Sequence, residues 1–82
     1  MENGSAIKKL EIRKDNSCPT CHIALEELIP IAKEHDIPVE IKQPLDTDDL
    51  IPVVCMVEDD IKTCFQGYDK RVKKLFKMFI KQ

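Results

Sequence analysis

The sequence predicts a small α/β domain with the element order β-α-β-β-β-α. Residues 7–13 and 37–42 alternate apolar and polar side chains, which is typical of strands with one buried face. Residues 19–35 and 69–82 repeat apolar side chains at steps of three and four, which indicates two helices. Residues 52–66 contain two apolar runs separated by an acidic dipeptide, which predicts a β-hairpin.

The first two predicted strands each have one apolar face. We expect Leu10 and Ile12 to be buried in the first strand, and Val39 and Ile41 in the second. The segment that follows, residues 43–50, is short and rich in Asp and Pro, so we interpret it as a loop.

The hairpin and the first helix have clear local signals. If Asp59 and Asp60 form a two-residue turn, Cys55 lies directly opposite Cys64 on the neighbouring strand. Pro19 suits the first turn of the first helix, where its missing N–H costs nothing.

The last helix has the strongest amphipathic pattern of the chain, and Asp69 stands where an N-cap is expected. Its apolar side chains form one predicted face: Val72, Leu75, Phe76, Phe79 and Ile80.

A right-handed β-α-β crossover makes the first two strands parallel, and the hairpin extends the same sheet in antiparallel fashion. We therefore expect a four-stranded mixed sheet with both helices mainly on one face. The other face should be largely open, or covered only by the loop at 43–50.

Composition narrows the classes of function. The 82 residues have a net charge of −2 and no long apolar run, so we expect one domain that is monomeric and binds neither nucleic acid nor membrane. Residues 1–5 are expected to be flexible. The N-terminal residues lack the apolar core of a secretory signal, which favours a cytoplasmic protein with reduced thiols.

The sequence Cys18-Pro-Thr-Cys21 stands at the start of the first predicted helix. Unpaired N–H groups and the positive end of the helix dipole stabilise a thiolate there and lower its pKa. Cys21, one turn later, is placed to attack a mixed disulfide on Cys18 and release the substrate. This spacing predicts a redox-active dithiol.

Two other interpretations of this pair stay open. Cys-Pro-x-Cys also occurs in zinc knuckles, and the pair could equally be inert. Zinc knuckles usually turn sharply at Gly after the second cysteine, whereas residues 22–28 continue the helical pattern. We therefore expect no bound metal, and a scaffold that binds a partner or zinc without turnover is the alternative function.

Three motifs occur in order along the chain: "CPTC" opening a helix, "LIPVV" opening a strand and "FQGYD" opening the last helix. Together they resemble the glutaredoxin branch of the thioredoxin-like superfamily, in a minimal form that lacks the helix between the second and third strands. The resemblance implies a cytoplasmic thiol-disulfide oxidoreductase that transfers electrons to disulfides in proteins or small molecules. Its implied partners are a disulfide-containing protein or glutathione, and a reductase. It implies no cofactor, apart from glutathione as a co-substrate.

The resemblance also assigns roles to individual residues. Cys18 would be the exposed nucleophile and Cys21 the buried resolving thiol. The Ile51-Pro52 bond would be cis. The remaining substrate-binding residues, together with Ile51 and Pro52, would be Pro19, Thr20, Tyr68 and Asp69, of which the last two resemble the glutaredoxin turn that holds glutathione.

Cys55 and Cys64 form a second candidate pair. As cross-strand neighbours at a non-hydrogen-bonded position, they lie within disulfide range. They could be small apolar fillers, a regulatory disulfide or a weak metal site.

Overall fold

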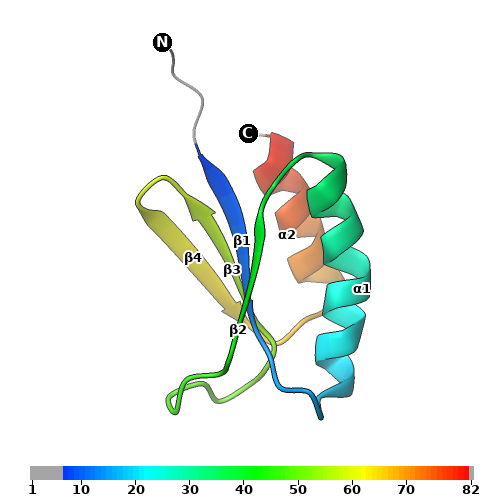
Figure 1. Cartoon of the computed structure of the whole chain (residues 1–82), viewed down its shortest axis with the longest axis vertical. Helices are drawn as coiled ribbons and strands as arrows, with labels where there is room; N and C mark the ends of the chain where they lie inside the picture. Colours follow the sequence, from blue (N-terminus) through cyan, green and yellow to red (C-terminus); the bar gives the residue numbers. More distant parts are fainter. Residues whose placement is uncertain (1–6, 82) are drawn as a thin grey trace.

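The computed structural model describes residues 7–81, so the expected flexibility of residues 1–5 lies outside the described part of the chain. The element order is the predicted one, with four strands and two helices (Figure 1). The elements are β1 (Lys8–Arg13), α1 (Pro19–Glu34), β2 (Val39–Lys42), β3 (Val53–Glu58), β4 (Ile61–Gln66) and α2 (Lys70–Lys81).

The strands form one mixed sheet in the order β2-β1-β3-β4. The β1 and β2 strands are parallel, whereas β1/β3 and β3/β4 are antiparallel, which confirms the predicted topology. The hairpin turns at Asp59 and Asp60 with Cys55 opposite Cys64, in the predicted register. Asp59 has a φ of 54°, a left-handed conformation that Asp adopts more readily than most residues.

Both helices pack on one face of the sheet, as predicted (Figure 1). Leu10 and Ile12 of β1 are fully buried beneath them, because alternate residues of a strand point to the same face. Other buried members of this core come from α1, β3 and α2: Ala24, Leu28, Ala32, Val54, Met56, Val72, Phe76 and Phe79, together with Ile37 just before β2.

The edge strand β2 differs from the prediction in its burial. Ile41 is the register partner of Ile12 and so shares its face, yet 43% of its surface is exposed. A strand at the edge of a sheet has a neighbouring strand on one side only. Its alternation of apolar and polar residues therefore predicts which face a side chain points to better than it predicts whether that side chain is buried. Ile37, which precedes the strand, is buried in the core instead.

The face opposite the helices is not largely open. Val53 and Cys55 are fully buried there, and Glu11 is only 2% exposed. The predicted loop at 43–50 does cover part of this face, since Asp48 is bound by Arg13 of β1. The charged side chains that complete the cover were not expected from the strand pattern.

Candidate active site

Cys18 is the N-cap of α1, with an extended backbone conformation. Its Sγ accepts a hydrogen bond from the backbone N–H of Cys21 at 3.1 Å, so the sulfur takes the place of the usual capping oxygen. Pro19 occupies the first helical turn and has no N–H to satisfy. The local sequence thus places a sulfur atom at the N-terminus of α1, which is the positive end of the helix dipole.

Cys18 and Cys21 are joined by a disulfide, with their Cα atoms 5.2 Å apart. Cys18 is half-buried, whereas Cys21 is 1% exposed beneath the first turn of the helix. An external thiol or disulfide therefore reaches Cys18 more readily than Cys21. The resemblance implied an exposed Cys18 and a buried Cys21; Cys21 is buried, and Cys18 is the more exposed of the two but only half-exposed.

The chain approaches Cys18 again at residues 51 and 52. The Ile51-Pro52 peptide bond is cis, as the resemblance implied, and the Ile51 carbonyl oxygen lies 3.8 Å from Cys18 Sγ. Pro52 is buried, and its carbonyl accepts a hydrogen bond from Gly67 N at 2.8 Å. Gly67 has a φ of 85°, which favours glycine. The start of β3 is thereby joined to the turn before α2.

Tyr68 and Asp69 both have partners within the protein. The Tyr68 hydroxyl donates to Glu27 Oε1 at 2.6 Å, and burial together with this bond raises the pKa of Tyr68. Asp69 Oδ1 accepts from Arg71 N at 2.9 Å and Val72 N at 3.1 Å, which makes Asp69 the predicted N-cap of α2. The side chains of Tyr68 and Asp69 thus both have structural roles within the protein.

The surface around Cys18 is polar and accessible. Pro19 and Thr20 are exposed, as is His22 one turn into the helix. The first turn of α1 contains no acidic residue, so no carboxylate there opposes a negative charge on Cys18. The site suits a thiolate nucleophile that exchanges with an external disulfide.

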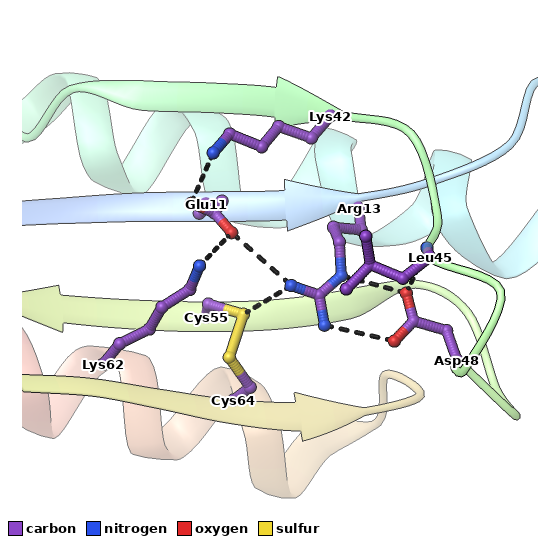
Figure 2. Close-up of a disulfide and its surroundings, with 8 residues drawn as sticks. All are labelled: Glu11, Arg13, Lys42, Leu45, Asp48, Cys55, Lys62 and Cys64. Carbon is purple, nitrogen blue, oxygen red and sulfur yellow. Dashed lines mark hydrogen bonds and ion pairs between the residues drawn. A yellow bond between two sulfur atoms is a disulfide. The ribbon is translucent and has the colours of Figure 1, made fainter.

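The second cysteine pair, Cys55 and Cys64, is also joined by a disulfide, with Cα atoms 4.0 Å apart (Figure 2). Of the three interpretations of this pair, the structure therefore has the disulfide. The residues around it form a polar cluster on the face opposite the helices, which we call the β-face cluster: Glu11, Arg13, Lys42, Asp48 and Lys62.

Glu11 is the buried centre of the β-face cluster. Its carboxylate oxygens lie 3.2 Å from Lys42 Nζ and 2.7 Å from Lys62 Nζ. Burial opposes ionisation of Glu11, but the hydrogen bonds and charges of the two lysines outweigh burial and hold its pKa below the usual value. Glu11 is thus a carboxylate at neutral pH.

Arg13 connects the loop at 43–50 to the disulfide (Figure 2). Its Nε and Nη2 bind the two carboxylate oxygens of Asp48 at 2.9 and 3.1 Å, in a bidentate pair. The hydrogen bond from Arg13, with a second from Leu45 N, lowers the pKa of Asp48. The third nitrogen, Nη1, lies 3.9 Å from Cys55 Sγ.

Sequence reasoning missed the β-face cluster because it treated that face as open. One signal was present: the alternation that buries Leu10 and Ile12 also places Glu11 and Arg13 together on the other face. The register of β3 on β1, with Cys55 opposite Glu11, places Cys55 on that face too. Nothing local showed that the loop would fold back to bring Asp48 there.

No protein-family model and no curated protein matches this chain. Among residues 7–81, no three His, Cys, Asp or Glu side chains are grouped so that they could hold a metal ion. Within the same range, neither helix is long and apolar enough to cross a membrane.

Proposed function

We propose that this protein is a thiol-disulfide oxidoreductase of the glutaredoxin-like type, with Cys18 as nucleophile and Cys21 as resolving thiol. The observation that carries the proposal is the position of the Cys18–Cys21 disulfide at the N-terminus of α1. There the half-buried sulfur accepts a helix N–H, and its partner is buried one turn inside. These are the features that thiol exchange in two steps requires.

The reaction starts from the reduced dithiol. The Cys18 thiolate attacks one sulfur of a substrate disulfide, forms a mixed disulfide and releases the other sulfur as a thiolate. Cys21 then loses its proton and attacks Cys18 Sγ, which releases the second substrate thiolate and forms the Cys18–Cys21 disulfide. Two electrons pass to the substrate, and glutathione or a reductase returns them to the dithiol.

The helix contributes to the first step. The Cys21 N–H that donates to Cys18 Sγ at 3.1 Å stabilises the attacking Cys18 thiolate. Burial of Cys21 protects the resolving thiol from external disulfides.

Several surrounding residues would contact the substrate. The backbone of Ile51, whose carbonyl oxygen lies 3.8 Å from Cys18 Sγ, would pair with an extended peptide or with glutathione. Pro19 and Thr20, both exposed, would border the same position, whereas Pro52 is buried and would act through the position of Ile51. Tyr68 and Asp69 would present the backbone of their turn rather than their side chains, since both side chains are already bound.

The fold supports the proposed relationship at a coarser level. A four-stranded mixed sheet with two helices on one face agrees with a minimal glutaredoxin-like domain, in which loop 43–50 replaces the usual helix. We further propose a cytoplasmic monomer that acts on a disulfide-containing protein or on glutathione.

The test is reduction of a small model disulfide with glutathione as electron donor. Cys18→Ser should abolish turnover, while Cys21→Ser should accumulate a mixed disulfide on Cys18 that mass spectrometry detects. A Cys55→Ser/Cys64→Ser variant is the matched control and should retain turnover. Full activity of Cys18→Ser would sink the proposal, and stoichiometric zinc in protein purified without added metal would favour a scaffold.

A further inference from the structure

The two residues of the Cys55–Cys64 disulfide differ in their exposure to solvent. Cys55 lies on the interior strand β3 and is fully buried, whereas Cys64 lies on β4 and is exposed. The β4 strand ends the sheet order, so no described strand pairs with its outer edge.

The direction of the disulfide makes the two sulfurs unequal in reactivity as well. A thiolate attacks a disulfide sulfur from the side opposite the bond that breaks. The bond runs from β3 to β4, so the approach to Cys64 comes from beyond the sheet edge (Figure 2). The approach to Cys55 would come from the side of β1, where Glu11 is its register partner and Arg13 lies 3.9 Å away.

The surroundings of Cys55 also favour it as the leaving sulfur. Two nitrogens of Arg13 bind Asp48, and the third is directed at Cys55 Sγ. That third nitrogen also lies 3.6 Å from Glu11, whose carboxylate is paired with Lys42 and Lys62. Lys42 is also paired with Glu40 at 3.0 Å, so the cation that faces the sulfur is Arg13. Its guanidinium is already in place for a thiolate on Cys55.

The geometry points to a second thiol-exchange site at the sheet edge, in which an external thiolate attacks Cys64 Sγ and Cys55 leaves beside Arg13. The new bond joins the external sulfur to Cys64, and the electron pair of the broken bond stays on Cys55. A second external thiolate then attacks the external sulfur of the mixed disulfide and releases the Cys64 thiolate. The bridge gains two electrons, and two thiols become one disulfide.

The site takes thiols, either small ones such as glutathione or cysteine side chains of another protein. It uses neither Cys18 nor Cys21, so it goes beyond the proposed function and can be tested in a chain that lacks that function.

The test uses the full chain with Cys18→Ser and Cys21→Ser, oxidised and treated briefly with reduced glutathione. Acid quenching, alkylation with N-ethylmaleimide and peptide mapping then locate each adduct. We expect glutathione on Cys64 and the alkyl group on Cys55. Glutathione mainly on Cys55, equal labelling of both cysteines, or no reaction over hours would overturn the inference. A cysteine-containing peptide in place of glutathione distinguishes the two sources of thiol by their relative rates.

The role of Arg13 is tested by the rate of the same reaction. Arg13→Gln should slow attack about threefold to tenfold, because a less stabilised thiolate leaves more slowly. Asp48→Asn is the matched control, since it weakens the loop contact but keeps the cation, and it should react at nearly the parent rate. An equal decrease of the rate in both variants, or no decrease in Arg13→Gln, would show that Arg13 does not stabilise the leaving thiolate of Cys55. The labelling experiment decides the site even if Arg13→Gln does not fold.

Discussion

The two disulfides of this domain have different kinds of hydrogen-bond donor beside them. Cys18 receives a backbone N–H from Cys21, which no side-chain substitution removes directly. Cys55 receives the guanidinium of Arg13, which depends on a single side chain and on its partner Asp48. The chemistry of Cys18 should therefore tolerate changes among neighbouring side chains, whereas that of Cys55 should depend on the β-face cluster.

Glu11 gives a pH-dependent prediction. Because its pKa is lowered in the folded protein, its ionised form contributes stability above the unfolded-state pKa, near 4.5, and this contribution is lost as pH falls through the folded-state value. Glu11→Gln should lower the free energy of unfolding at pH 7 by about 1 kcal/mol, a modest value because both lysines are about half exposed.

Urea denaturation at pH 7 and pH 3 measures this effect. The difference between the parent protein and Glu11→Gln should shrink at pH 3, because the unfolded chain binds a proton at Glu11 more readily than the folded protein does. Glu26→Gln on the exposed face of α1 is the control and should show little difference at either pH. A pH-independent difference for Glu11→Gln would contradict the assigned ionisation.

The helices and strands follow from local patterns to different degrees. The two-residue turn set the hairpin register, and the apolar stripe of α2 placed Phe76 and Phe79 in the core as predicted. The burial of edge strand β2 was predicted less well, because the burial of Ile41 depends on which other elements pack over the edge of the sheet. The helix starts use different caps: sulfur at Cys18 in α1 and a carboxylate at Asp69 in α2.

The Asp69 cap gives a prediction for α2. Asp69→Ala should lower the free energy of unfolding by about 1 kcal/mol, because the N–H groups of Arg71 and Val72 lose their acceptor. Asp69→Asn retains a capping oxygen and should remain close to the parent. Thermal or urea denaturation measures both variants, and equal stability of Asp69→Ala and Asp69→Asn would show that the cap contributes little.

Residues 7–81 form one layer of helices and one sheet, and they place no second helical layer on the opposite face. That face is covered by loop 43–50, which Arg13 holds through Asp48, and by the side chains of Lys42 and Lys62. The Cys55–Cys64 disulfide joins its last two strands. An 82-residue chain buries only a modest core, so a covalent cross-link adds a substantial fraction of its stability.

Loss of the Cys55–Cys64 disulfide should therefore be measurable in the intact domain. The bridge closes a loop with a sequence separation of 9, for which the reduced freedom of the unfolded chain is worth about 2–3 kcal/mol. Cys55→Ala/Cys64→Ala should be less stable than the parent by that amount under oxidising conditions. In the presence of a strong reductant the difference should fall to about 1 kcal/mol or less, which reflects packing alone. A difference that persists unchanged under reduction would assign the effect to packing instead of the cross-link.

The order of residues dictates the elements, the hairpin register, the caps and the position of Cys18 and Cys21, because each depends on neighbours within one or two turns of chain. The β-face cluster depends on contacts between distant residues: Arg13 and Asp48 are separated by 35 positions, and Glu11 meets lysines from β2 and β4. The contact between Arg13 and Asp48 forms only when loop 43–50 folds over the sheet, and no periodic pattern encodes where a loop packs. For the same reason the sequence placed Cys55 opposite Cys64, but three-dimensional packing buried one sulfur beside a guanidinium and left the other at the sheet edge.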